Sequence, residues 1–167
     1  MSGKAIGKTL DIGYAGTVSR SQDCIISNRA VNKESNEIVF GQAVVLEGDN
    51  TVRKIKTGDT ADKFFGIAIR EVKQTTDYIS SSGSYLPSSP CDILERGTVV
   101  VKCNNGTPKA GGKVYVRIDI NESVQKGVVG EFEAVEDTDK TVELSNVVFT
   151  TGKVDTNGNV EITILTR

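Results

Sequence analysis

The side chains that most often carry out chemistry in proteins are scarce in this sequence. There is no histidine, which removes the usual general base near neutral pH and the Ser-His and Cys-His nucleophile pairs. Cys24, Cys91 and Cys103 are far apart and show none of the Cys-x-x-Cys spacing of a zinc site. These residue types predict a protein that is not an enzyme and that has no metal, no cofactor and no small-molecule substrate.

Two stretches imitate phosphate-binding loops but lack the rest of the motif. Ala110-Gly111-Gly112-Lys113 is followed by Val114, not by Ser or Thr, and leads into a strand pattern where the motif requires a helix. Gly7-Lys8-Thr9 resembles the end of such a loop, but no strand pattern precedes it. Neither stretch predicts a nucleotide site.

The stretch from Asp155 to Asn159, DTNGN, imitates part of a calcium-binding loop. An EF-hand also needs flanking helices, and no helical pattern surrounds this stretch. Asn157-Gly158 is instead typical of a β-hairpin, because a type I′ turn needs positive φ at both central residues. We therefore predict a hairpin turn here.

A cluster of carboxylates is the remaining candidate for a chemical site. Its members are spaced like outward-facing strand positions followed by a turn. A solvated acidic face is the preferred interpretation, and an acid pair or a weak cation site is the alternative. The cluster consists of Glu131, Glu133, Glu136, Asp137 and Asp139.

Charge and hydropathy limit the partners. The formal net charge is −2 and no basic stripe stands out, so we expect no nucleic-acid partner. No segment approaches the roughly 20 apolar residues that span a bilayer, so we expect no membrane partner. An odd number of widely spaced cysteines favours reduced thiols in a protein made in a cytoplasm; a bond between Cys91 and Cys103 is the alternative.

From about residue 36 the sequence becomes a succession of short apolar runs separated by turn residues. The strongest run is CDILERGTVVVKC at 91–103, and KVYVRID at 113–119 alternates apolar with charged or polar residues. No stretch keeps a helical period over three turns. The pattern predicts an all-β fold, either a single β-sandwich or a β-barrel domain.

The run KFFGIAI at 63–69 carries a more specific prediction. Phe65, Ile67 and Ile69 fall on one face of the expected strand, and two small residues, Gly66 and Ala68, fall on the other. Small side chains within a strand indicate that another layer approaches closely.

The first 34 residues differ from the rest, because their apolar residues are interrupted by glycines and keep no long helical or strand period. We interpret residues 1–34 as an extended N-terminal arm and residues 35–167 as the body. The arm is slightly basic and its aliphatic side chains need a surface to cover them, so we expect it to form an interface. The candidate interface residues are Ile6, Leu10, Ile12, Tyr14 and Val18.

Several segments, taken together and in order, resemble the structural cement, or capsid decoration, proteins of tailed bacteriophages. The resemblance lies in the body and is weak in the arm. The segments are GIAIREVKQTTDY (66–78), YLPSSPCDILERGTVVVK (85–102), NNGTPKAGGKVYV (104–116), VELSNVVFTTGK (142–153) and VEITILT (160–166).

The resemblance implies an all-β protein, often a homotrimer, that docks on the outside of the capsid. There such a protein bridges neighbouring copies of the major capsid protein and stabilises the shell. It implies a protein of the virion, on the capsid outer surface, that is synthesised in the host cytoplasm. It supplies no catalytic residues and no contact residues. Another β-rich virion part, such as a tail, baseplate or head-fibre component, is the alternative, and a carbohydrate-binding module is a weaker one.

Overall fold

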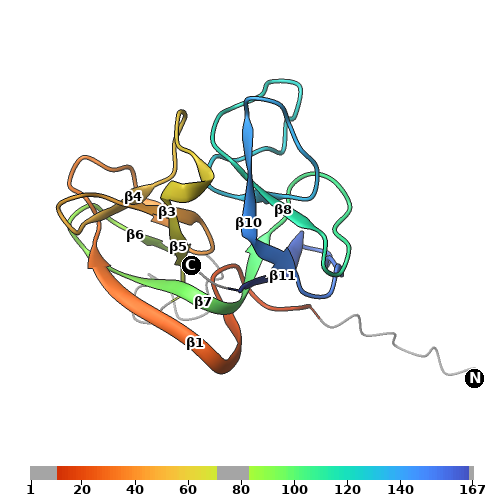
Figure 1. Ribbon diagram of the computed structural model, residues 1–167, viewed down its shortest axis with the longest axis horizontal. Coiled ribbons are helices and arrows are strands. Elements are labelled where there is room, and N and C mark those ends of the chain that lie inside the picture. The colour runs from red at the N-terminus through yellow and green to blue at the C-terminus, as the bar shows by residue number, and fades with distance from the viewer. Residues whose placement is uncertain (1–10, 71–82, 166–167) are drawn as a thin grey trace, which may run out of the picture.

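The structure, a computed structural model, describes residues 11–70 and 83–165 of the chain, and its regular secondary structure is almost entirely β-strand (Figure 1). The all-β fold predicted from the short apolar runs is confirmed. A single helical turn, η1 (Ala61–Lys63), occurs among these residues, and none of their helices is long and apolar enough to cross a membrane. The strands are β1 (Val18–Ala30), β2 (Ile38–Val39), β3 (Ala43–Leu46), β4 (Val52–Lys54), β5 (Phe64–Ala68), β6 (Ser84–Tyr85), β7 (Pro90–Lys102), β8 (Lys113–Arg117), β9 (Phe132–Glu133), β10 (Thr141–Phe149) and β11 (Asn159–Ile164).

Strand β7 connects the two parts of the molecule. Its first part pairs with β5, where Leu94 lies opposite Ile67, and its second part pairs with β11 from Gly97 to Lys102. The change of partner occurs at Gly97, whose φ of 124° is unfavourable for a side chain and bends the strand. Strand β1 pairs with β7 along nearly its whole length.

The long sheet has the strand order β4-β3-β5-β7-β11-β10-β8-β9, and each of its ends curls back. A parallel bridge joins Val31, just after β1, to Val52 of β4, and another joins Cys103, just after β7, to Phe132 of β9. We call the part with β2 to β6 and the start of β7 the N-lobe, and the part with the end of β7 and β8 to β11 the C-lobe. Figure 1 shows the N-lobe on the left and the C-lobe on the right, with β7 passing from one to the other.

The described residues form two apolar cores, and the larger one joins the lobes. The larger is formed by both lobes and includes Ile67, Leu94, Val116 and Ile162. The smaller lies on the other side of the N-lobe strands, beneath the two-stranded β2-β6 sheet, and includes Tyr85. Strand β5 is therefore buried on both faces, which explains its continuous apolar sequence.

A β-bulge in β5 changes the predicted assignment of its faces. Val44 and Val45 of β3 lie opposite Gly66 and Phe64, so the intervening Phe65 is an extra residue. Phe64 and Ile67 consequently face the larger core, and Phe65 faces the smaller one. The prediction that Phe65 shares a face with Ile67 is therefore wrong, because strict alternation assumes an unbroken ladder.

At Gly66 the close neighbour is the adjacent strand β7 of the same sheet, and not another layer as the small side chains predicted. A Cβ atom added there would lie 2.4 Å from the Leu94 carbonyl oxygen. We expect Gly66→Ala to lower the free energy of unfolding by about 1–3 kcal/mol, because β7 would have to shift. Gly48→Ala is the matched control, since its Cβ would meet nothing within 4 Å. Chemical denaturation of both variants tests this, and equal stability would contradict the packing described here.

The sequence does not predict β1. This strand and β7, with 13 residues each, are the longest of the described strands. The pairing of β1 with β7 shifts register between Val18 and Arg20, between Arg20 and Ile25, and again between Ile25 and Ile26. Each shift changes which residues face the protein, so the apolar positions lose the two-residue period on which a strand prediction depends. Part of the segment 1–34 is thus paired with β7; the division at residue 34 itself stays a prediction.

The expectation of a solvated acidic face is wrong for Glu133. This side chain and that of Arg117 are both 0% exposed. Nη2 of Arg117 lies 2.9 Å from one Glu133 oxygen and 2.8 Å from Asp137, and its Nε also donates to Glu133. The hydrogen bond to Glu133, followed by that to Asp137, raises the pKa of Arg117 against the opposing effect of burial. Glu136 and Asp139 are exposed as expected.

The turn predicted at Asn157-Gly158 is present, but its type differs. The Gly158 N–H donates to the Asp155 carbonyl at 3.1 Å, and the Asp155 N–H donates to the Asn159 carbonyl at 3.0 Å. Gly158 has a φ of 78°, whereas Asn157 is not in the positive-φ region. The turn is therefore not type I′, because only one of its residues is left-handed.

All three cysteines are free thiols, as the preferred interpretation predicts. Cys91 is fully buried, and burial raises its pKa. Burial also raises the pKa of Cys103 to about 11. Both thiols are therefore protonated near neutral pH and are poor nucleophiles.

Candidate functional site

Residues 11–17, which we call the arm root, lie against the C-lobe before the chain enters β1. The turn ahead of β11 holds them. The Ile12 N–H donates to Oδ2 of Asp155 at 3.3 Å, and Nδ2 of Asn159 donates to the Gly13 carbonyl at 2.9 Å. This turn therefore fixes the point at which the N-terminal segment meets the body.

Asp155 is the centre of this attachment. Its Oδ1 accepts the N–H groups of Asn157 and Asn159, each at 2.8 Å, and its Oδ2 accepts from Ile12 and from Nδ2 of Asn159. Burial raises the pKa of Asp155, but the hydrogen bonds from Asn159, Asn157 and Ile12 together outweigh burial and hold the pKa below its ordinary value. Both carboxylate oxygens are occupied by donors, so this turn is an anchor for the arm root and differs from a calcium loop.

We expect Asp155→Ala to release the arm root, because it removes the acceptor for several backbone donors. Amide hydrogen exchange should become faster at Ile12, Asn157 and Asn159 while the core amides keep their protection. Because the folded pKa is lowered, the ionised anchor stabilises the protein above the ordinary carboxyl pKa and loses this effect as the pH falls through the folded value. Unchanged exchange at these amides would contradict the role of Asp155 as an anchor.

A second set of contacts holds the end of the arm root between the lobes. The Gly16 N–H donates to the Val100 carbonyl at 2.7 Å, and the Arg70 N–H donates to the Gly16 carbonyl at 2.8 Å. Gly16 has a φ of 85°, and a Cβ there would lie 2.8 Å from the Arg70 nitrogen, so the position requires glycine. The Arg70 guanidinium lies 4.9 Å from the centre of the Tyr14 ring, a cation–π distance.

The structure places the predicted interface residues in different environments. Ile6 and Leu10 lie outside the described residues. Ile12 and Val18 are half-buried, and Val18 packs against the larger core. Tyr14 is 47% exposed beside Arg70. Of the described candidates, Tyr14 is therefore the one most available to a partner.

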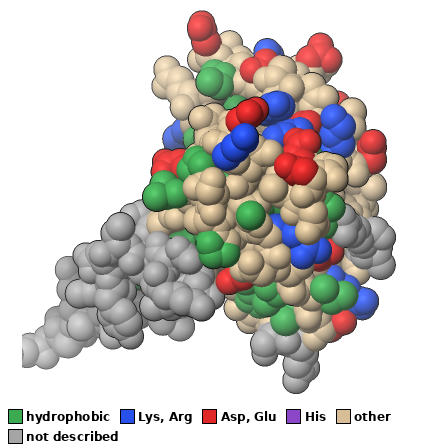
Figure 2. All heavy atoms as spheres, turned by 90° about the vertical axis from the view of Figure 1, so that its left-hand side faces the viewer, with side chains coloured by type: hydrophobic (Ala, Val, Ile, Leu, Met, Phe, Trp, Pro, Cys, Tyr) green, Lys and Arg blue, Asp and Glu red, His purple; other side chains and the backbone are tan. Residues whose placement is uncertain are grey.

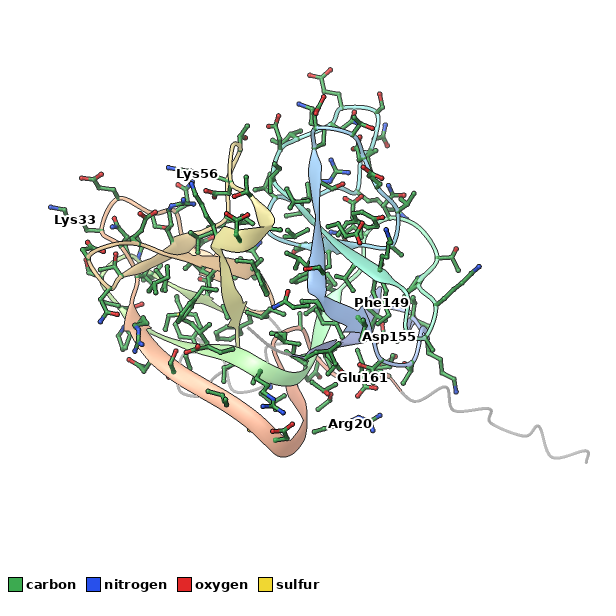
Figure 3. The ribbon with its side chains drawn as sticks, viewed as in Figure 1. Arg20, Lys33, Lys56, Phe149, Asp155 and Glu161 are labelled. Carbon is green, nitrogen blue, oxygen red and sulfur yellow. The ribbon has the colours of Figure 1, made fainter. Side chains whose placement is uncertain are left out.

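Strand β1 adds two residues that were not among the predicted interface residues. Ile25 and Ile26 are consecutive in the sequence yet 51% and 46% exposed, because the register shift between them turns both toward solvent. Around them Arg20 pairs with Glu161 at 3.6 Å, as Figure 3 shows, and Arg96 pairs with Asp23 at 2.8 Å. At least one side chain of each pair is largely exposed, and surface ion pairs contribute about 0–1 kcal/mol, so the exposed isoleucines are the more distinctive feature.

The described residues include the acidic cluster for which the sequence left an acid pair or a weak cation site as the alternative. Among the described residues, no three Asp, Glu or Cys side chains gather to hold a metal ion. Asp155, Asp137 and Asp59, three carboxylates whose pKa is lowered, are already engaged in the anchor or in ion pairs. The exposed large apolar residues of the arm root and β1 are Tyr14, Ile25 and Ile26.

Comparisons with known proteins give the class of protein. The chain is similar in fold to a chain in the solved structure of the capsid of the Myoviridae phage XM1, with a TM-score of 0.69, 17% sequence identity and coverage of 98% of both chains. The family model of the XM1 gp53 minor capsid protein matches residues 3–164. No curated protein matches the chain. The chain is thus a tailed-phage capsid protein and a structural part of the virion. It belongs to the XM1 gp53 minor capsid protein family.

Proposed function

We propose that the chain is a cement, or decoration, protein on the outer surface of the tailed-phage capsid. In this role it binds the major capsid protein and stabilises the contacts between neighbouring major capsid subunits. The observation that carries the proposal is the anchored arm root. Residues 1–10 precede a segment that Asp155 holds in place, and an extended segment of that length spans at most roughly 33–36 Å.

The chemistry of the segment 1–34 fits this role. Ile6 and Leu10 supply apolar side chains, and burial of each would contribute roughly 1.5–3 kcal/mol before the cost of ordering the segment. Tyr14, Ile25 and Ile26 supply exposed apolar surface on the part that is fixed to the body. As a homotrimer the protein would present three such segments, and binding of the first would raise the effective concentration of the others. The proposed role involves no turnover and no cofactor.

The proposal is tested with phage heads that lack this protein. Purified chain is added to the heads, and separately to isolated tails, and each mixture is sedimented. We expect the chain to sediment with heads only, and the decorated heads to withstand a higher temperature before they release DNA. Binding to tails but not to heads, or binding without any gain in head stability, would contradict a cement function.

A further inference from the structure

A groove of about 510 Å³ lies beside strand β4, in the N-lobe, at a distance from the arm root. Its lining includes Ser35 and Asn36 on one side, Lys54 and Ile55 of the β4 segment, and Val129 from a loop of the C-lobe. In Figure 3, Lys56, which also lines the groove, lies at the top of the N-lobe, far from Asp155 in the C-lobe.

The wall of the groove is fixed before any partner binds. The Asn32 N–H donates to the Val52 carbonyl at 2.7 Å, and Nδ2 of Asn32 donates to Thr51 at 3.0 Å. The Asn32 carbonyl and side chain in turn accept the N–H groups of Ser35 and Glu34. A preorganised wall of this kind lowers the entropic cost of binding.

The charged groups of the groove are not equally available. Arg53 already donates to Asp59 at 2.6 and 2.8 Å and also to Glu47. Lys54, by contrast, has no carboxylate within ion-pair distance among residues 11–70 and 83–165. Its side chain is half-buried, and Gly130 packs against it, since a Cβ there would lie 3.1 Å from Cε of Lys54.

The environment of Lys54 leaves its charge poorly compensated. Burial is the largest influence and lowers the pKa of the ammonium group, while the more distant Glu131 and Glu37 raise it. A cation that has lost part of its hydration without gaining a close anion favours the arrival of an external carboxylate. Figure 2, which faces the N-lobe side, shows acidic and basic side chains interspersed and no broad hydrophobic area on the part that is not grey, so this side offers polar contacts.

We infer that the groove beside β4 is a second contact with the capsid and that it takes a carboxylate side chain of a neighbouring capsid subunit, which pairs with Lys54. The inference rests on the proposed function and adds the chemistry of the partner. The arm root offers the apolar side chains of Ile12 and Tyr14, whereas the groove offers a cation, so the two contacts differ in kind. Their positions in different lobes suit a protein that bridges two subunits.

Chemical footprinting of lysines on decorated heads tests the inference directly. Free protein and head-bound protein are acetylated under the same conditions, and each lysine is quantified by mass spectrometry. We expect Lys54 to be protected at least fivefold on heads, while Lys126, an exposed lysine of the C-lobe, keeps its reactivity. A carbodiimide should then link Lys54 to an Asp or Glu of a capsid subunit through an amide bond, while the carboxyl oxygen that is lost passes to the carbodiimide, which becomes a urea.

A pair of variants completes the test. Lys54→Met keeps the aliphatic stem and should weaken binding to heads about tenfold or more, because a charge-assisted hydrogen bond is lost; Lys126→Met should change it less than twofold. If Lys54 is acetylated equally in free and bound protein, the inference is overturned and the cement function stands. If the chain does not sediment with heads at all, the cement function fails and the inference with it.

Discussion

Replacing Glu133 with Ala should lower the free energy of unfolding by about 3 kcal/mol or more, one of the largest effects expected in this protein. The change removes the principal partner of Arg117, whose guanidinium is fully buried. Asp137 would be the one carboxylate left beside it among the described residues, together with the Asp119 carbonyl. Gly127 lies directly above the guanidinium, since an added Cβ would be 2.5 Å from Nε, so water cannot readily replace the lost carboxylate.

The control for this prediction is a solvent-exposed ion pair that includes Lys113, which lies in β8 like Arg117. Lys113 and Glu143 lie 2.9 Å apart, with side chains 67% and 40% exposed, and Glu143→Ala should cost about 1 kcal/mol or less. Urea denaturation of both variants gives the comparison. If both variants lose the same free energy of unfolding, burial does not make the Arg117–Glu133 pair more important for stability, and the prediction is contradicted.

Removal of residues 1–10 should have the largest effect on capsid binding. We expect affinity for heads to fall about 10- to 100-fold, which corresponds to about 1.4–2.8 kcal/mol, because Ile6 and Leu10 are lost. The free energy of unfolding should stay within about 0.5 kcal/mol, because no described contact is removed. Head sedimentation over a range of protein concentrations measures the first quantity, and thermal denaturation measures the second.

A finer form of this experiment replaces Ile6 and Leu10 with Asp in the full chain. Ile120→Asp is the matched control, since Ile120 is an exposed apolar residue of the C-lobe, 67% exposed, that the proposal does not use. Weakened binding for the arm variant and normal binding for the control are expected. If the arm variant binds normally, the contact with the capsid lies elsewhere on the body.

The structure also changes how the arm should be dissected. A deletion of residues 1–34 would remove β1, which pairs with β7 from Val18 to Ala30, and would expose one edge of the central strand. Loss of binding by that variant would therefore report on folding as well as on the arm. The shorter deletion separates these effects because it ends before the arm root.

The sequence alone predicted those elements whose side chains alternate regularly. Val114 and Val116 face the larger core as their spacing indicates, and β7 and β8 lie where the runs at 91–103 and 113–119 predicted strands. Alternation works there because an unbroken ladder places every second residue on the same face. Close packing around Gly66 was also predicted, because a small residue within a strand commonly marks a place where a neighbouring segment approaches closely.

The features that the sequence did not predict all depend on distant pairings. The register shifts in β1 and the bulge at Phe65 are set by the partner strands, so no local sequence pattern predicts them. Glu133 appears solvated in the sequence because Arg117 is far along the chain. The sequence gives a partial signal for the anchor at Asp155, because an Asp ahead of Asn-Gly commonly accepts backbone hydrogen bonds in turns. No sequence signal predicts its hydrogen bond from Ile12.

The physical basis of the proposed role is a fixed body with contacts at separate places. The N-terminal segment leaves the C-lobe at a point set by Asp155, and the groove beside β4 opens on the N-lobe. Strand β7 is shared by the sheets of both lobes, so a force on one lobe is carried to the other through its hydrogen-bonded ladder. Such a body can hold two neighbouring subunits at a constant separation.

An electron-microscopy map of the virion tests the cement function most directly. We expect density for the two curled lobes on the outer surface of the head, over junctions between major capsid subunits, with the segment before Asp11 extending onto a neighbouring subunit. Heads assembled without this chain should lack that density and be otherwise alike. Density for the chain inside the shell, or in the tail alone, would contradict the account.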